Sequence, residues 1–276
     1  MYRDHRVAVI VPAYNEAPAI GAVVNDILSL SGKSNSQPVV DALIVADNGS
    51  HDDTAGIAAL GGATVVREPQ KGYGAACLAG IAALPDVDVV VFVDGDRSVD
   101  VSELPTLLDA LIDGADVVIG SRALGRQQPG SMTIVQHYGN RLAAWLLTRF
   151  WGTPVTDLGP FRALSLDALH KLNMQDRAFG WTVEMQIKAL RGGMRVVEVP
   201  VTNNRRIGQS KVSGTLRGTI GASSTILGMI ARCGFADMAR RIGARLPGRR
   251  HQDAQSRVVD AACPELSASW KPASKD

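Results

Sequence analysis

The sequence predicts an α/β fold, with a mainly parallel sheet covered by helices on both faces. Three observations support this prediction. Apolar runs of strand length alternate with stretches of helical spacing through the first half of the chain. The strand-like runs are continuously apolar, which is typical of strands that are buried on both faces. Three of them end in polar clusters, and parallel sheets bind ligands at the carboxyl ends of their strands.

The predicted elements fall into a regular first half and a less regular second half. In the first half, strands are predicted over 7–13, 39–46, 63–66, 87–93 and 116–120, and helices over 16–30, 54–60, 72–84 and 101–113. In the second half, helices are predicted over 136–151, 181–191 and 213–232, with strands over 155–164 and 194–201. The expected organisation is a main domain over 1–210, an amphipathic helix over 211–236 and a basic, poorly ordered tail over 237–276.

Composition excludes several classes of protein. The 29 basic and 27 acidic residues give a net charge of +2, too balanced for a nucleic-acid-binding protein. The three cysteines lie far apart and suggest neither a zinc site nor a disulfide framework. No apolar run reaches the length of a membrane-spanning helix. We therefore expect a cytoplasmic protein, with a peripheral position on the inner face of the cell membrane left open.

Asp94-Gly95-Asp96 carries the strongest chemical signal, because it follows the most apolar predicted strand. Two carboxylates one residue apart can hold a hard cation such as Mg²⁺ or Mn²⁺, which bridges the phosphates of a nucleoside diphosphate. Gly95 allows a tight turn between them. Alone, an acidic turn after a strand is common, so the position at a sheet edge gives the motif its weight.

Two further polar clusters are expected at the same edge. Asp47 can accept hydrogen bonds from a base or a ribose, while Ser50 or Asp52 caps the following helix. Tyr14 can pack on a base or a sugar, and Glu16 can favour the helix start and reach a polar ligand.

In order and spacing, these motifs resemble the family 2 glycosyltransferases of the Rossmann-like GT-A fold. The matching segments are Val11-Pro12-Ala13-Tyr14-Asn15-Glu16, Asp47-Asn48-Gly49-Ser50 with Asp52 and Thr54, Lys71-Gly72 with Gly74-Ala75-Ala76, Asp94-Gly95-Asp96 and Gly120-Ser121-Arg122. Within the family, the chain is most similar to the dolichyl/polyprenyl-phosphate sugar synthases. That closer similarity lies in Thr156-Asp157-Leu158-Gly159-Pro160-Phe161-Arg162 and Arg205-Arg206-Ile207-Gly208-Gln209-Ser210-Lys211.

The resemblance implies a role for each matching position. Donor-binding residues would be Pro12, Tyr14, Glu16, Asp47, Lys71, Asp94, Arg122, Lys211 and one of Arg205 and Arg206. Asp94 and Asp96 would hold Mg²⁺ or Mn²⁺, and Asp96 also counts among the catalytic residues. Arg162 and Trp181 would lie on the acceptor side. The chain has Asn48 where a second acidic residue is common, and Gly159-Pro160 where the family usually has Ser-Gly, which leaves the acceptor open.

The expected reaction is an inverting transfer of a hexose from a UDP- or GDP-sugar to a polyprenyl phosphate or another lipid-linked acceptor. A phosphate acceptor is already anionic, whereas a hydroxyl acceptor needs a general base. Asp157 and Glu184 are the candidate bases. The alternatives are that Asp157 only orients Arg162 and that Glu184 only stabilises a helix start. Trp181 is as readily a core residue as an acceptor contact.

Other functions remain open at this level. They are transfer to a soluble hydroxyl acceptor, a sugar-phosphate nucleotidyltransferase, and a non-catalytic nucleotide-sugar-binding protein. A nucleotidyltransferase normally carries a Gly-rich signature after its first strand, and this chain has Pro12 to Glu16 there. The expected partners are a nucleotide sugar and a lipid-phosphate or glycan acceptor, without nucleic acid. Peripheral membrane contact through 213–250, packing of that helix on the domain, and a homo-oligomer are all left open.

Overall fold

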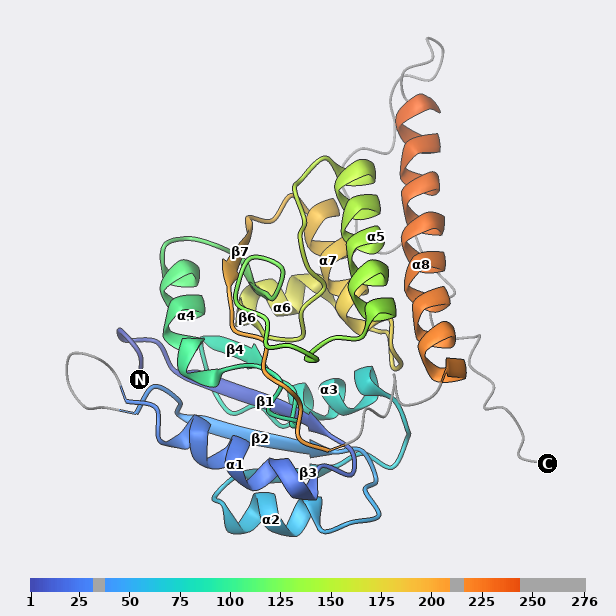
Figure 1. Ribbon diagram of the computed structural model, residues 1–276. Helices are drawn as coiled ribbons and strands as arrows, with labels where there is room; N and C mark the ends of the chain where they lie inside the picture. The colour runs from blue at the N-terminus through green and yellow to red at the C-terminus, as the bar shows by residue number, and fades with distance from the viewer. Residues whose placement is uncertain (32–37, 209–215, 244–276) are drawn as a thin grey trace.

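The computed structural model of the protein describes residues 1–31, 38–208 and 216–243, without the side chains of 216–223 and 243. Its centre is a seven-stranded sheet in the order β3-β2-β1-β4-β6-β5-β7 (Figure 1). The strands are β1 (Val7–Ala13), β2 (Ala42–Asp47), β3 (Thr64–Arg67), β4 (Val89–Phe92), β5 (Val117–Ser121), β6 (Arg162–Ser165) and β7 (Val196–Pro200). β6 runs antiparallel to both of its neighbours, and the other six strands share one direction. The predicted α/β class is confirmed.

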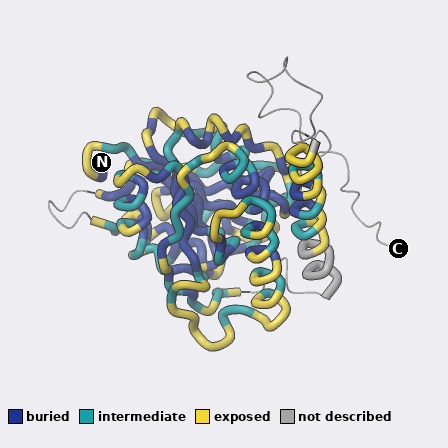
Figure 2. Tube along the Cα trace, turned by 90° about the horizontal axis from the view of Figure 1, so that it is seen from above, coloured by how far each residue is buried: buried dark blue, intermediate teal, exposed yellow. Residues whose placement is uncertain are grey.

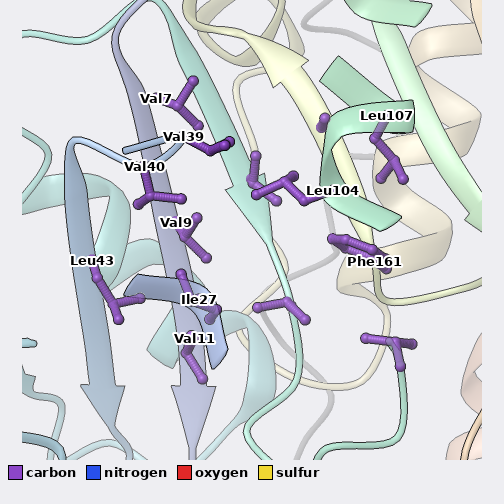
Figure 3. Packing of buried hydrophobic residues seen from close by; sticks show 14 of the residues in the cluster. Val7, Val9, Val11, Ile27, Val39, Val40, Leu43, Leu104, Leu107 and Phe161 are labelled. Carbon is purple, nitrogen blue, oxygen red and sulfur yellow. The ribbon is translucent and has the colours of Figure 1, made fainter. Parts of the chain in front are cut away.

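Helices cover both faces of the sheet because both sets of alternating strand side chains are apolar. Val7, Val9 and Val11 of β1 pack on one face with α1, α2 and α4 (Figure 3). Ala8 and Ile10 pack on the other face with α3, α6 and α7. The helices are α1 (Ala17–Leu28), α2 (Thr54–Leu60), α3 (Tyr73–Ala82), α4 (Leu104–Ile112), α5 (Ile134–Trp151), α6 (Leu166–Leu172), α7 (Trp181–Arg191) and α8 (Leu216–Gly243), with a short 3₁₀ helix η1 (Val101–Glu103) before α4.

A third layer forms where α5 and α8 lie side by side over α7 (Figure 1). Its core joins Leu147 of α5, Val183 and Ile187 of α7, and Met229 and Ile230 of α8. Seen from above, the buried residues gather along the sheet and exposed ones mark the periphery (Figure 2). The described part of α8 therefore packs on the domain, one of the alternatives left open by the sequence.

The structure corrects several predicted boundaries. The strand expected over 155–164 is reduced to β6, because the segment before it is a loop around a buried Asp157. The helix expected from 101 begins as η1, capped by the Asp100 carboxylate, and α4 starts with Pro105 in its first turn. α6 and the reversed direction of β6 were not predicted.

The C-terminal helix also ends later than expected. α8 continues to Gly243, past the boundary placed at 236, because Asp237 accepts hydrogen bonds from Trp151 Nε1 at 3.0 Å and Arg191 Nε at 2.7 Å. The remainder of the expected tail, 244–276, and residues 211–215 of the expected helix lie outside the described residues. Among the helices described, none combines the length and apolar character needed to cross a bilayer.

Candidate active site

The parallel strands bring distant polar segments to one edge of the sheet. β1, β2 and β4 end at Ala13, Asp47 and Phe92, and the chain beyond each end lines a cavity of about 250 Å³. The cavity is lined by Pro12, Ala13, Tyr14, Glu16, Asn48, Lys71, Gly72, Tyr73, Ala76, Asp94, Gly95, Asp96, Phe179 and Arg206. Seven of the predicted site residues therefore meet here: Pro12, Tyr14, Glu16, Lys71, Asp94, Asp96 and Arg206.

Asp94 sits in a strongly perturbed environment. Its Oδ1 accepts a hydrogen bond of 3.0 Å from the hydroxyl of Tyr73. Burial, reinforced by the negative charge of Asp96, raises the pKa of Asp94 to about 7. Burial and the nearby Asp94 also raise the pKa of Tyr73, so its hydroxyl keeps the proton that it donates. Two carboxylates that disfavour each other's charge form a site where a cation is strongly favoured.

Asp96 is held on both of its oxygens. Oδ1 accepts a 2.9 Å hydrogen bond from the backbone N–H of Ser98, and Oδ2 forms an ion pair with Arg206. The backbone N–H of Ile207 also donates to the Asp96 carbonyl, at 2.9 Å, which fixes the arginine-bearing segment over the sheet edge. The Nε of Arg206, a residue that lines this cavity, is buried and has no hydrogen-bond partner among the described residues.

The structure separates the two adjacent arginines that the sequence could not tell apart. Arg206 lines the cavity, whereas Arg205 points to the 128–130 loop. Arg205 Nε donates to the carbonyl of Pro129 at 2.7 Å, and its backbone N–H donates to Gln128 Oε1 at 3.1 Å. Lys211, the other predicted phosphate contact in this segment, lies outside the described residues.

On the β1–β2 side of the cavity, the ammonium group of a lysine lies over an aromatic ring. Lys71 Nζ lies 3.7 Å from the centre of the Tyr14 ring and donates to the carbonyl of Gly49 at 2.9 Å. The contact holds the ammonium group in place at the rim without neutralising its charge. The arrangement therefore offers an aromatic face and a positive charge next to the two carboxylates.

The loop that carries Lys71 is braced by Asn48, whose role the sequence did not indicate. Asn48 Nδ2 donates to the carbonyls of Gln70 and Glu68 at 2.7 and 3.2 Å, and its Oδ1 accepts from the N–H of Gly72 at 2.7 Å. A carboxylate at this position could accept but not donate, so the asparagine fits where an acidic residue is common.

Glycines let the same loop approach the 176–178 segment. Gly72 has φ +146°, and a Cβ on Gly74 would lie 1.9 Å from the carbonyl oxygen of Asp176. The backbone N–H of Gly74 donates to the carbonyl of Ala178 at 3.1 Å. Between these glycines stands Tyr73, a residue that sequence reasoning missed. Its only signal was a large polar aromatic side chain inside a glycine-rich loop.

The position of Asp47 differs from the one expected for a residue that contacts the nucleoside. It is buried, it does not line the cavity, and its Oδ1 accepts a 3.2 Å hydrogen bond from the backbone N–H of Ser50. The structure thus places Asp47 as a brace for the turn that follows β2, and its neighbour Asn48 reaches the cavity instead.

Arg122 and Asp157 form a buried ion pair beside a second cavity. The Asp157 carboxylate accepts from Arg122 Nη2, Nε and backbone N at 2.8, 2.9 and 2.7 Å, and Asp157 is fully buried. Burial by itself lowers the pKa of Arg122. The negative charges of Asp157, Asp94 and Asp96 together outweigh that effect, so the pKa of Arg122 is raised above its ordinary value. The second cavity, of about 460 Å³, is lined by Arg122, Ala123, Gln127, Met132, His137, Asn140, Arg141, Ala144, Trp145, Thr148, Val155, Thr156 and Asp157.

Three further predicted site residues lie outside both cavities. Arg162 is buried and donates to the carbonyls of Gly159 and Thr182, each at 2.7 Å, and burial lowers its pKa to about 10. Trp181 packs in the core, with its ring centre 5.9 Å from that of Phe92. Neither side chain lines either cavity, and their acceptor-side role stays a prediction.

Glu184 is also a structural brace. Its buried carboxylate accepts from the backbone N–H groups of Gln175 and Asp176 at 3.1 and 2.8 Å, and it pairs with Lys188 at 2.8 Å. It thereby fixes the segment on which the glycine-rich loop rests. This explains the residue better than the general-base role predicted from the sequence, since all of its contacts are internal.

We expect Asp94→Asn to raise the melting temperature at pH 8 and to leave it unchanged near pH 4. The folded-state pKa of about 7 exceeds the ordinary value of 3.8, so the folded protein binds the additional proton between these values. Wild-type stability therefore falls as the pH rises through that window, a loss that asparagine avoids while still accepting from Tyr73. Thermal unfolding at the two pH values measures it, and a lower melting temperature of the variant at pH 8 would contradict the assignment.

Comparison with known proteins identifies the family. The family model described as "Glycosyl transferase family 2" matches residues 8–172. The chain belongs to glycosyltransferase family 2. A glycosyltransferase of Mycobacterium tuberculosis, whose name calls it uncharacterised, is 38% identical over 217 residues, covering 78% of this chain and 93% of the relative. The undecaprenyl-phosphate mannosyltransferase of Micrococcus luteus is 32% identical over 244 residues, covering 82% and 96%.

Solved structures confirm the GT-A fold of this family 2 glycosyltransferase. Glucosyl-3-phosphoglycerate synthase from Mycobacterium tuberculosis, crystallised with Mn²⁺, UDP-glucose and phosphoglyceric acid, superposes with a TM-score of 0.61 at 24% identity. The similarity covers 89% of this chain and 82% of that one. The sheet edge described above is the ligand-binding edge expected for an α/β fold of this kind.

The two carboxylates of this glycosyltransferase fit a divalent cation. Among the described residues, no cluster of three or more His, Cys, Asp or Glu side chains could hold a metal alone. Asp94 and Asp96 would thus supply two oxygen ligands and leave the others to phosphate and water, the pattern typical of Mg²⁺ in phosphate-binding enzymes. A bound cation would also relieve the repulsion that raises the pKa of Asp94.

Proposed function

We propose that the enzyme transfers a hexose from a UDP- or GDP-sugar, with inversion, to a polyprenyl phosphate or another lipid-linked acceptor. The observation that carries this proposal is the cavity in which Asp94 and Asp96 face Arg206, with Lys71 over Tyr14 at its rim. The cavity pairs a site for a cation with positive charges and an aromatic face, which together suit a nucleoside diphosphate.

The donor half of the reaction requires stabilisation of the departing diphosphate. Asp94 and Asp96 would hold Mg²⁺ or Mn²⁺, which when bound neutralises charge on the phosphates. Arg206 would turn its unpaired Nε, and Lys71 its ammonium group, towards the phosphate oxygens. Tyr14 would pack on the nucleoside, with Pro12 and Glu16 beside it. We also propose Lys211 as a phosphate contact, because the family resemblance implies that role.

The contacts of the two predicted bases favour an anionic acceptor. A hydroxyl acceptor needs a carboxylate free to take its proton, whereas a phosphate acceptor is already ionised. Asp157 is held in three hydrogen bonds by Arg122, and Glu184 is enclosed by backbone N–H groups and Lys188. Asp157 lines the second cavity, but its hydrogen bonds to Arg122 occupy its carboxylate, and Glu184 lines neither cavity, so these contacts favour an acceptor that needs no base.

The second cavity offers a place for an acceptor phosphate. Arg122, His137 and Arg141 line it, and each can donate hydrogen bonds to phosphate oxygens. The nearby Asp94 and Asp96 help to raise the pKa of Arg122, so this guanidinium, which lines the second cavity, also lies near the two carboxylates of the first cavity. Inversion would require an acceptor phosphate held there to attack the anomeric carbon from the side opposite the departing diphosphate.

Relatives support a lipid-phosphate acceptor, since one of them is named for transfer of mannose to undecaprenyl phosphate. Such an acceptor implies work at the inner face of the cell membrane by a peripheral enzyme. The sequence suggested contact through 213–250, but the described part of α8 buries Met229, Ile230 and Cys233 on the domain. Only Phe235, Met238 and Ile242 stand out as exposed large apolar side chains among its described residues.

The proposal is tested by incubating the protein with UDP- and GDP-hexoses, Mn²⁺ and either undecaprenyl phosphate or the corresponding alcohol. We expect sugar transfer to the phosphate, loss of transfer with a chelator, and a product of inverted anomeric configuration by NMR. Transfer only to the alcohol or to a soluble sugar would contradict the phosphate acceptor and indicate a hydroxyl acceptor. A product that retains the anomeric configuration of the donor would overturn the inverting mechanism.

A further inference from the structure

α5 exposes a continuous apolar stripe that no described residue covers. The exposed fractions are 77% for Ile134, 66% for Tyr138 and 59% for Trp145. Val135 and Leu142, at 57% and 46%, widen the same stripe. Residues spaced by four, eight and eleven positions fall on one side of an α-helix, so these five side chains share a single face.

The stripe is a fixed feature of the fold. Thr133 and Gln136 form a capping box at the start of α5, and Gly152 ends the helix in a left-handed conformation. The opposite face is buried through Ala143 and Leu147 against α7 and α8. The helix is therefore anchored on one side and presents the other outwards. Exposed contiguous apolar surface of this kind marks an interaction site.

The edges of the stripe are basic and adjoin the second cavity. Arg141 lies beside the stripe and Arg149 lies within its arc at the C-terminal end, both exposed. Arg141 and Trp145 also line the second cavity, so that cavity opens at the border of the apolar face. An amphipathic helix with aromatic residues and arginines at its margin is suited to the interface of an anionic bilayer.

We propose that α5 docks on the surface of an anionic bilayer through Ile134, Val135, Tyr138, Leu142 and Trp145. This inference rests on the proposed function, since a docked stripe places the mouth of the second cavity where the phosphate of a membrane-embedded acceptor lies. It locates the contact in α5, a segment distinct from the 213–250 region suggested by the sequence.

A bilayer suits the stripe better than a second copy of the chain. In a symmetric antiparallel pair of α5 helices, Arg141 near the middle would face its own copy, and like charges at an interface are unfavourable. An anionic membrane instead attracts both arginines while the aromatic rings of Tyr138 and Trp145 sit at the level of the headgroups.

The test is co-sedimentation of the full chain with vesicles of phosphatidylcholine and phosphatidylglycerol. We expect the wild type to bind, and Ile134→Glu/Leu142→Glu to lose more than about tenfold in partitioning, because charge in the stripe prevents its insertion. Neither residue lines a cavity. Leu60→Glu on α2, where Leu60 is 89% exposed, is the matched control and is expected to bind as the wild type does.

Two results would overturn the docking proposal: equal binding by the stripe variant, or a wild-type dimer that the stripe variant dissolves without any change in vesicle binding. Weaker binding to pure phosphatidylcholine is expected from the arginines. Transfer to detergent-solubilised undecaprenyl phosphate separates this inference from the proposed function. Transfer in detergent without vesicle binding rejects the docking surface alone, whereas vesicle binding without transfer to any acceptor rejects the proposed reaction alone.

Discussion

Asp96→Asn is expected to lower the rate of sugar transfer by about a thousandfold or more, because it removes a charge from the centre of the donor site. The neutral amide would neither hold a divalent cation nor form an ion pair with Arg206, whose Nε already lacks a hydrogen-bond partner among the described residues. Steady-state kinetics at saturating donor, with melting temperatures to confirm folding, measure the effect.

Asp86→Asn is the matched control for this substitution. Asp86 lies before β4, at the opposite end of the strand from Asp96, and pairs with Arg6 while 84% of its side chain is exposed. An exposed ion pair contributes little, so the control should transfer sugar at the wild-type rate. If Asp96→Asn has wild-type kinetics at ordinary metal concentrations, the assignment of Asp96 to the active site is wrong.

Asp157→Ala is expected to lower the free energy of unfolding by about 3 kcal/mol, because it leaves the half-buried Arg122 without its carboxylate. The Asp157 side chain is fully buried and the pair has three hydrogen bonds. Urea denaturation measures the loss. Asp167→Ala, which breaks the exposed pair with Lys171, should change the same quantity by less than about 1 kcal/mol.

The substitution also decides between the base role predicted for Asp157 and the pairing with Arg122 that the structure shows in place of the predicted contact with Arg162. If Asp157 is a structural partner of Arg122, its removal lowers stability strongly. Activity then falls because less protein is folded and because Arg122 is displaced. A general base instead predicts a kcat that falls steeply while unfolding free energy stays near the wild-type value. The second outcome would contradict the placement of Asp157 and reopen the hydroxyl-acceptor alternative.

The sequence was sufficient to predict which strand ends meet at one edge of the sheet. Continuous apolar runs identified β1, β2 and β4 as buried parallel strands, and that alone brings the residues after Ala13, Asp47 and Phe92 together. The prediction succeeded because it needed only strand direction and order of motifs. It placed the start of β6 too early, in the proline- and glycine-containing loop before the strand, and it could not give the reversed direction of β6.

Side-chain direction was the part that the sequence could not supply. Arg205 and Arg206 are adjacent in an irregular segment, and only the contacts with Pro129 and Asp96 separate them. Arg162 and Glu184 resemble ligand-binding residues in sequence, yet Arg162 donates to backbone carbonyls, and Glu184 accepts from backbone N–H groups and pairs with Lys188. Tyr73 escaped notice because its link to Asp94 spans 21 positions.

The most direct measurement is nucleotide binding by the wild type, followed as a change in melting temperature with and without a divalent cation. The account predicts that UDP or GDP raises the melting temperature clearly with Mn²⁺ or Mg²⁺ present, and that a chelator or Asp96→Asn removes most of the rise. No rise with either nucleotide, or an equal rise without the cation and in Asp96→Asn, would contradict a metal-bound nucleoside diphosphate at Asp94 and Asp96.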